Sequence, residues 1–239
     1  MNKLLSTLFA LLVASATGLA HAQAAPAAAP GAAASAAAAS NVKQSAPASP
    51  ASLQAKIAMC LGCHNIPGYQ ASFPEVHKVP MIAGQTPAYI ETALKAYKTG
   101  ERKHPTMRGI ADALTEQDIK DISAYYSKLG GATTVADKPA REPSPQVAGL
   151  LQKAACVSCH GANFSKPIAN YPKIAGQHKD YLYVALRAYK QDNNPTLGRS
   201  NGIMAGIARQ FSNAELKAMA EYIGSLDGEL KTVSDSRFH

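Results

Sequence analysis

The sequence has no tryptophan, and only 6% of its 239 residues are aromatic. No segment alternates polar and apolar residues with the period of two that a half-buried β-strand requires. Small domains built from so few large side chains would have thin hydrophobic cores. These absences argue against a β-rich fold and favour small helical domains whose cores need apolar material beyond their own side chains.

Cysteine is scarce as well, and none is left over. All four cysteines lie in two strings of the form Cys-x-x-Cys-His, at residues 60–64 and 156–160. This form is the attachment signature of a c-type haem. The sequence therefore predicts two covalent haem c groups, with thioether bonds to Cys60, Cys63, Cys156 and Cys159.

The spacing within each string has a chemical reason. Two cysteines three residues apart lie on one side of a helical turn, where both sulfur atoms can reach the vinyl groups of one porphyrin. The next residue, His64 or His160, is then held beneath the iron and can bind it through a ring nitrogen. The alternatives are a structural zinc site or a pair of disulfides. Zinc sites of this kind are found mostly in reducing compartments, whereas this chain begins like an exported protein.

The first 22 residues have the features of a cleaved secretory signal. Lys3 supplies the positive charge, residues 4–19 are apolar, and Ala20-His21-Ala22 forms a small-x-small cleavage site. Cleavage there predicts a mature chain that begins at Gln23 and resides in the periplasm. The alternative is an uncleaved membrane anchor, but the apolar run is short for a span and is interrupted by small polar residues.

Composition divides the rest of the chain into segments. Residues 23–52 are nearly all Ala, Pro and Ser, and they are predicted to form a disordered leader, either a spacer or a peripheral tether to a membrane partner. The remaining length suits two small domains, and a proline-rich stretch between them predicts a linker. The predicted boundaries are 53–131 for the first domain, 132–146 for the linker, 147–228 for the second domain and 229–239 for a C-terminal tail.

Charge limits the partners. The formal net charge is +8, and the basic residues are dispersed along the chain. A modest positive field favours docking to acidic redox proteins. Dispersed charge without a recognition motif argues against nucleic acid as a partner.

The chain contains one unit twice. Residues 80–85 are Pro-Met-Ile-Ala-Gly-Gln, and residues 172–177 are Pro-Lys-Ile-Ala-Gly-Gln. A tyrosine-rich segment follows in each copy. The copies differ in length at two places: residues 65–79 exceed their counterpart by about four residues, and residues 191–203 exceed theirs by about five. Different surroundings, and different reduction potentials, are therefore expected for the two haems.

Helix signals also repeat. A short helix is predicted to lead into each haem string, from about Leu53 and from about Gln146. A middle helix follows Thr86-Pro87, an N-cap followed by proline, and stops at Gly100. The last helix opens with a capping box in both copies, Thr115 with Asp118 and Ser212 with Glu215. Each unit is thus predicted to hold three or four helices, and the fold to be all-α.

The ligand on the other side of each iron is predicted from the repeat. Of the six methionines, only Met107 and Met204 occupy matching positions, 43 and 44 residues after the two histidines. They are predicted to lie in loops and to be the axial ligands, because electron-carrying haem proteins usually fill this position. The alternatives are that both methionines only pack in the core, or that His104, three residues before Met107, binds the first iron instead.

With both haem strings, the Pro-x-Ile-Ala-Gly-Gln segments, the tyrosines and the matched methionines in place, the chain resembles a dihaem cytochrome c4 from about Leu53 to Leu226. The resemblance implies two class I cytochrome c domains related by a pseudo-twofold axis, with haem propionates near the interface. It implies a monomer that carries electrons in the periplasm, from a quinol-oxidising complex to a haem–copper terminal oxidase.

The resemblance also implies roles for single residues. His64 with Met107, and His160 with Met204, would bind the two irons. Pro80 and Pro172 would offer backbone carbonyls to the histidines. Contacts to the haem propionates are expected from Gln85, Gln177, Tyr89 and Tyr181.

The leading functional hypothesis is an electron shuttle without enzymatic activity. A dihaem peroxidase is a rival, but it would need an accessible iron or a displaceable ligand, which a matched methionine pair argues against. A further rival is an electron-transfer subunit bound to a periplasmic dehydrogenase or oxidase. It would share the haem chemistry and differ only in its partner.

Overall fold

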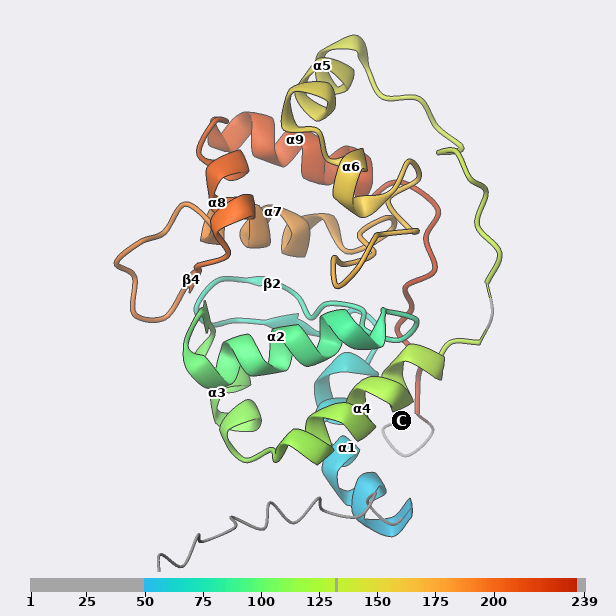
Figure 1. Ribbon diagram of the computed structural model, residues 1–239, viewed down its shortest axis with the longest axis vertical. Helices are drawn as coiled ribbons and strands as arrows, with labels where there is room; N and C mark the ends of the chain where they lie inside the picture. The colour runs from blue at the N-terminus through green and yellow to red at the C-terminus, as the bar shows by residue number, and fades with distance from the viewer. Residues whose placement is uncertain (1–49, 132, 236–239) are drawn as a thin grey trace, which may run out of the picture. The chain divides into compact units, whose positions relative to one another are not determined.

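The computed structural model describes residues 50–131 and 133–235 (Figure 1). The predicted signal and leader lie outside the described residues, except that helix α1 begins at Pro50, before the predicted end of the leader at residue 52. Within the described part of the chain, no helix is long and apolar enough to cross a membrane. The helices are α1 (Pro50–His64), α2 (Pro87–Thr99), α3 (Pro105–Asp112), α4 (Glu116–Lys128), α5 (Pro145–Ala154), α6 (Val157–His160), α7 (Lys179–Ala188), α8 (Gly202–Ala208) and α9 (Asn213–Ile223).

Local sequence signals account for the helix ends. The Thr86 side chain accepts a hydrogen bond from the backbone of Tyr89, Pro87 occupies the first turn, and Gly100 ends α2 with a left-handed φ of 81°. Both predicted capping boxes are present, at Thr115–Asp118 before α4 and at Ser212–Glu215 before α9. Helix α5 begins at Pro145, within the last two residues of the predicted linker.

The two copies enter their haem strings differently. In the N-terminal half (α1–α4), α1 runs without a break through Cys60 and Cys63 to His64. In the C-terminal half (α5–α9), α5 ends at Ala154, and Ala155 adopts a left-handed conformation with φ of 49°. The separate short helix α6 then carries the second histidine. The helix predicted to lead into the second string is therefore interrupted.

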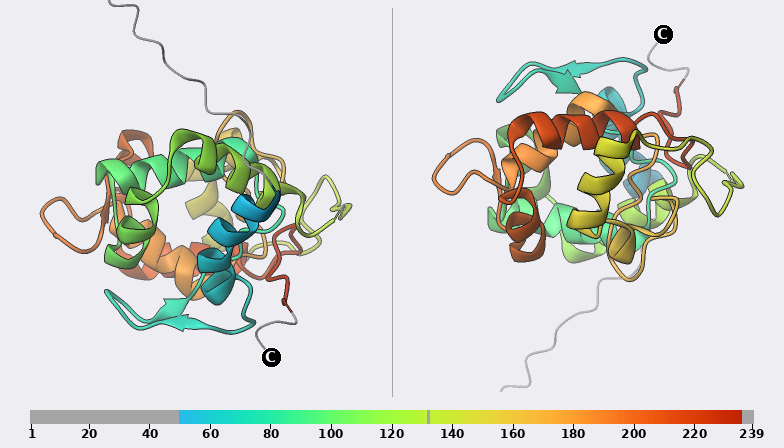
Figure 2. Two further views of the ribbon diagram at one scale, coloured as in Figure 1. Left: turned by 90° about the horizontal axis from the view of Figure 1, so that it is seen from below. Right: turned by 90° about the horizontal axis from the view of Figure 1, so that it is seen from above.

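Each half has its own hydrophobic core. In the N-terminal half, α2 packs against α4, as Figures 1 and 2 show, and Ile119, Ile122 and Tyr126 of α4 are almost completely buried. In the C-terminal half, α9 packs against both α5 and α7 and buries Leu216 and Met219. Each fully buried large aliphatic side chain contributes about 1.5–3 kcal/mol, and neither core contains a tryptophan.

The described residues also form four two-residue strands, which the sequence did not indicate, and one of the two strand pairs joins the halves. Strands β1 (Gln70–Ala71) and β2 (His77–Lys78) form an antiparallel hairpin, and β3 (Arg102–Lys103) pairs with β4 (Gly198–Arg199). Each strand has only two residues, too few for an alternating pattern to be visible. The β1–β2 hairpin and β4 lie in the two segments that make the copies unequal in length.

The hairpin is fastened to α7 of the other half. The backbone N–H of Lys78 donates to the Asp180 carboxylate at 2.8 Å, and Glu75 forms an ion pair with Arg187. Strand β4 pairs with β3 across the halves, and Ser200 donates to the backbone oxygen of Glu101 at 2.9 Å. The extra residues of each copy therefore hold it to the other copy.

The predicted C-terminal tail also crosses to the N-terminal half. The backbone N–H of Lys231 donates to the Ala83 carbonyl at 3.1 Å, and Val233 packs against the N-terminal core. Gly84 has a φ of 82°, and a β-carbon built on it would lie 2.6 Å from the backbone oxygen of Glu229. Only glycine allows the tail to approach this closely.

We expect Gly84→Ala to lower the free energy of unfolding more than Gly68→Ala does. Gly68 has a comparable φ of 72° with no atom near its added β-carbon, so its replacement carries only the backbone strain, about 1–3 kcal/mol. Gly84→Ala adds the collision with the tail, about 1–3 kcal/mol more. Guanidinium unfolding of the two haem-loaded variants measures the difference. Equal losses would mean that the tail does not constrain this turn.

Candidate haem sites

The two string histidines make the same hydrogen bond. His64 ends α1, and its Nδ1 lies 2.8 Å from the backbone oxygen of Pro80. His160 ends α6, and its Nδ1 lies 2.9 Å from the backbone oxygen of Pro172. A carbonyl can only accept, so Nδ1 must carry the proton in both rings. Nε2 is then the unprotonated nitrogen, which is the atom that can bind a metal.

The protonation state of these rings also suits ligation. Burial lowers the pKa of both His64 and His160, although the bond to a proline carbonyl opposes the shift in each. A lower pKa favours the neutral imidazole. Neutral imidazole is the form that binds iron.

The cysteines lie beside the two cores as unpaired thiols. Cys60 packs against the N-terminal core and Cys156 against the C-terminal core, and all four thiols are partly exposed. Burial raises the pKa of Cys60 and of Cys156 to about 11, so both are uncharged. Among the described residues there is no cluster of three or more His, Cys, Asp or Glu side chains that could hold a metal ion. Unpaired thiols are the form that thioether attachment to haem requires.

The matched methionines lie in short helices, so the prediction that they lie in loops was wrong. Met107 is in the first turn of α3 and Met204 in the first turn of α8. Each helix is started by the residue three positions earlier: His104 Nδ1 accepts from the Met107 N–H at 3.4 Å, and Asn201 Oδ1 accepts from the Met204 N–H at 3.0 Å. Both methionines are half-buried, and Met107 packs with Cys60 against the N-terminal core.

The cap gives His104 a structural role. Its side chain begins α3 in the way that Asn201 begins α8. Two unlike residues at matching positions thus do the same work, which is to satisfy the methionine N–H.

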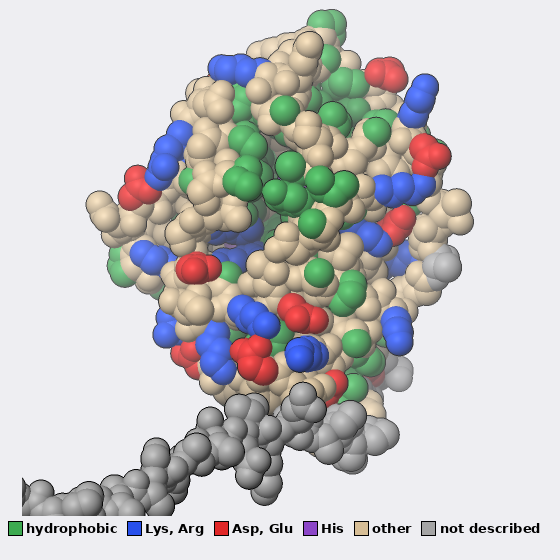
Figure 3. Space-filling model, in the orientation of Figure 1, with side chains coloured by type: hydrophobic (Ala, Val, Ile, Leu, Met, Phe, Trp, Pro, Cys, Tyr) green, Lys and Arg blue, Asp and Glu red, His purple; other side chains and the backbone are tan. Residues whose placement is uncertain are grey.

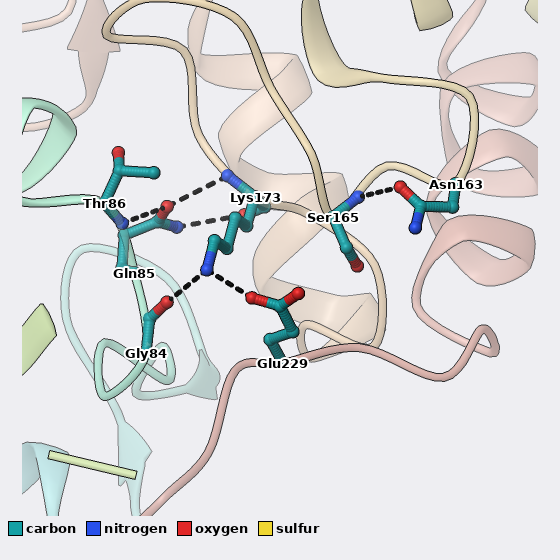
Figure 4. A network of polar contacts seen from close by, with 7 residues as sticks. All are labelled: Gly84, Gln85, Thr86, Asn163, Ser165, Lys173 and Glu229. Carbon is teal, nitrogen blue, oxygen red and sulfur yellow. Dashed lines mark hydrogen bonds and ion pairs between the residues drawn. The ribbon is translucent and has the colours of Figure 1, made fainter. Parts of the chain in front are cut away.

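Gln85 and Gln177 contact the opposite half of the chain. Gln85 donates to the backbone oxygen of Lys173 at 3.0 Å and accepts from its N–H at 2.9 Å (Figure 4). Gln177 donates to the backbone oxygen of Met81 at 2.9 Å and accepts from its N–H at 3.0 Å. Both amides are thus engaged by the backbone of the opposite half. The expected contacts to the haem propionates stay a prediction.

Tyr89 and Tyr181 lie beside a pair of arginines that the sequence analysis did not single out. Arg102 of β3 donates to the Tyr181 hydroxyl at 2.6 Å and to the Tyr89 hydroxyl at 3.3 Å. Arg199 of β4 donates to the Tyr181 hydroxyl at 3.1 Å. The internal repeat could have revealed this pair, because each arginine stands five residues before its matched methionine.

This arginine pair carries positive charge that no acidic side chain neutralises. Neither guanidinium makes an ion pair within the described part of the chain, and the buried Nε of Arg102 has no hydrogen-bond partner there. Burial alone would raise the pKa of Tyr181, but the two guanidinium groups outweigh it and lower that pKa to about 8. At neutral pH the phenol is therefore mostly protonated. A site of this kind fits a group that brings carboxylates, as haem does with its two propionates.

The surface agrees with a bound apolar group. The space-filling view shows a hollow in one face, with hydrophobic side chains gathered around it and Lys or Arg atoms deep within it (Figure 3). Two histidines with free Nε2 atoms, four unpaired thiols and an uncompensated cationic cluster together fit two c-type haems.

Comparisons with known proteins also point to a c-type cytochrome. A family model described as cytochrome c matches residues 147–227. Cytochrome c4 of Stutzerimonas stutzeri is 31% identical over 187 residues, which cover 72% of this chain and 87% of the relative. A thiosulfate dehydrogenase electron acceptor of Thiomonas intermedia is 26% identical, over 76% of this chain and 84% of the relative.

A solved structure is also similar. Reduced recombinant cytochrome c4 from Pseudomonas stutzeri aligns with a TM-score of 0.55 at 28% identity, over 75% of this chain and 99% of the other. Because the sequence relationship extends over most of a cytochrome c4 and both haem strings are present, the chain belongs to the cytochrome c4 family and carries two covalently attached haem c groups.

Proposed function

We propose that this c-type cytochrome is an exported electron carrier with no catalytic activity, in which each iron is held between a histidine and a methionine. The proposed pairs are His64 with Met107 and His160 with Met204. The supporting observation is that both copies repeat one arrangement: a histidine bonded to a proline carbonyl, and a methionine whose N–H is capped at the start of a short helix.

This ligand set suits electron transfer. Haem supplies a one-electron iron couple when it is bound. The proline carbonyls orient the histidine rings, and the helix caps fix the methionine backbones in the first turn of α3 and α8. Methionine ligation and burial both favour a high reduction potential. Residues 53–131 and 147–228 would be the two cytochrome c domains, each around one of the two cores, with a pseudo-twofold axis relating them.

The proposed site of the haem propionates is the arginine pair between the halves. Arg102 and Arg199 would supply charge-assisted hydrogen bonds to carboxylates, and Tyr89 and Tyr181 would orient the guanidinium groups. The fixed planar donors of arginine suit this task better than a lysine would.

Replacing a proposed axial methionine should change one haem only. We expect Met107→His and Met204→His each to lower one reduction potential by on the order of 100 mV, a small part of the ~0.8 V range over which axial ligands set haem potentials. Spectroelectrochemical titration of each variant measures this. In the parent protein, the oxidised form should show the weak near-red methionine–iron band, and the spectrum of the reduced form should not change when carbon monoxide is added.

Two results would contradict this assignment. Potentials unchanged in both variants would mean that neither methionine binds iron. A carbon monoxide shift in the parent protein would reveal an open iron, and measurable peroxide turnover would then favour the peroxidase alternative.

The arginine pair should raise the potentials. Arg102→Gln and Arg199→Gln remove a positive charge that disfavours ferric haem, so we expect potentials lower by tens of millivolts, where 59 mV is a tenfold change in the one-electron equilibrium. Arg→Lys at either position should restore most of the loss. The control is Arg209→Gln, which removes a half-exposed arginine paired with Asp192. An equal shift in the control would show that only net charge matters.

We further propose that the protein acts in the periplasm, accepts electrons from a quinol-oxidising complex and delivers them to a haem–copper oxidase. The formal charge of +8 becomes smaller when the signal with Lys3 is removed and each haem adds two propionates. The modest positive field that remains supports acidic partner surfaces. A second candidate donor is a thiosulfate dehydrogenase, because one relative carries the name of its electron acceptor.

Reduction rates distinguish the two donors. We expect the oxidised cytochrome to be reduced quickly by a quinol-oxidising complex with quinol, and the rate to fall as salt is added, because the docking charges are screened. Thiosulfate with a thiosulfate dehydrogenase is the parallel assay. Faster reduction in that assay would replace the quinol-oxidising complex as the proposed donor.

A further inference from the structure

The glutamine contacts between the halves converge on the peptide groups that orient the histidines. The peptide that joins Pro80 to Met81 contains both the Pro80 carbonyl and the Met81 N–H. His64 of the same half approaches the carbonyl at 2.8 Å, and Gln177 of the other half accepts the N–H at 3.0 Å. One planar unit is therefore held between a histidine on one edge and a glutamine on the other.

The second copy repeats this arrangement in the opposite direction. The peptide that joins Pro172 to Lys173 accepts from His160 at 2.9 Å through its carbonyl, and its N–H donates to Gln85 at 2.9 Å. Each glutamine therefore serves the histidine of the half to which it does not belong.

The two amides are rigidly placed. Gln85 and Gln177 are each only 4% exposed. Each Oε1 also accepts the N–H of the following residue, Thr86 or His178, at 3.0 Å, and each Nε2 donates to the backbone oxygen beyond the clamped peptide. All these contacts require one orientation of the amide. Neither side chain can therefore turn without leaving buried backbone groups unpaired.

A clamped peptide affects the histidine in two ways. Because the peptide is planar, holding the N–H fixes the direction in which the carbonyl points. Donation from the N–H also polarises the peptide and makes its carbonyl a better acceptor. A stronger acceptor at Nδ1 makes the imidazole a better electron donor to a metal at Nε2, which favours the oxidised metal.

We propose that Gln177 is a positioning residue for the first haem and Gln85 a positioning residue for the second, so that each half tunes the iron of the other. The inference rests on the proposed function, because it takes His64 and His160 as axial ligands. It adds that the potential of each haem depends on a side chain from the opposite half.

The two clamps differ in strength. The Lys173 side chain donates to the Gly84 backbone oxygen at 2.9 Å and forms an ion pair with Glu229, as Figure 4 shows. The matching residue, Met81, has no cationic group. The Pro172–Lys173 peptide thus keeps a second anchor if Gln85 is removed, and the first haem should be the more sensitive of the two.

The test is a crossed pair of variants in the haem-loaded protein. Gln177→Leu should raise the potential of the first haem and leave the second unchanged, and Gln85→Leu should do the reverse with a smaller effect. For Gln177→Leu we expect about a threefold change in the ratio of reduced to oxidised haem, which is about 28 mV for a one-electron couple. Each potential is assigned to its half with Met107→His and Met204→His. If a leucine variant does not fold, Gln→Met, which is unbranched, replaces it.

Matched controls are Gln117→Leu and Gln210→Leu. Each removes a glutamine whose amide donates within its own half, Gln117 to the Asp121 carboxylate and Gln210 to the Gly206 backbone oxygen. Both controls should leave both potentials unchanged.

The inference would be overturned by a shift in the same half as the replaced glutamine, by equal shifts of both haems, or by no shift. In each of these cases, methionine variants that still lower one potential each would leave the proposed function standing. Methionine variants without effect would instead remove the ligand assignment itself.

Discussion

The bond between each string histidine and a proline carbonyl is the interaction on which the rest of the structure depends. It sets the proton on Nδ1 and leaves Nε2 as the nitrogen that can bind a metal, in both halves alike. The direction of this bond depends on the orientation of the peptide group after Pro80 or Pro172, which lies in a loop and not in a helix. A buried glutamine amide from the opposite half holds this peptide group by a hydrogen bond to its N–H. The same glutamine bonds therefore join the two halves and hold the peptide groups to which the histidines are bonded.

Contacts between the halves also account for the two segments in which the copies differ in length. A duplicated unit would bind its partner only through surfaces present in both copies. Here the longer segment of the N-terminal half forms the β1–β2 hairpin that reaches α7, and the longer segment of the C-terminal half forms β4, which pairs with β3. The tail after α9 adds a third connection, at Ala83. The length differences thus add to the connection between the halves that the repeated glutamines Gln85 and Gln177 already make.

Two positively charged side chains, Arg102 and Arg199, lie together at the contact between the halves. Two arginines share one tyrosine hydroxyl, with no acidic side chain paired to either within the described residues. Such a cluster would be costly in a protein without anionic cofactors, because buried charge needs a partner. If the haem propionates are the partners, as proposed, the two arginines would stabilise the bound haem and their positive charge would raise its reduction potential.

The sequence by itself determined the covalent chemistry and the helices. Cys-x-x-Cys-His is a local signal, and capping boxes such as Thr115 with Asp118 act within one turn, so both are readable from neighbouring residues. Contacts between residues far apart in the sequence could be read only from the tertiary structure. The pairing of β3 with β4, which brings Arg102 opposite Arg199, and the crossed glutamines join residues 88 to 97 positions apart. Met107 and Met204 also proved to lie in the first turns of short helices. The caps of these helices, a histidine and an asparagine, satisfy the same methionine N–H although they share no sequence pattern.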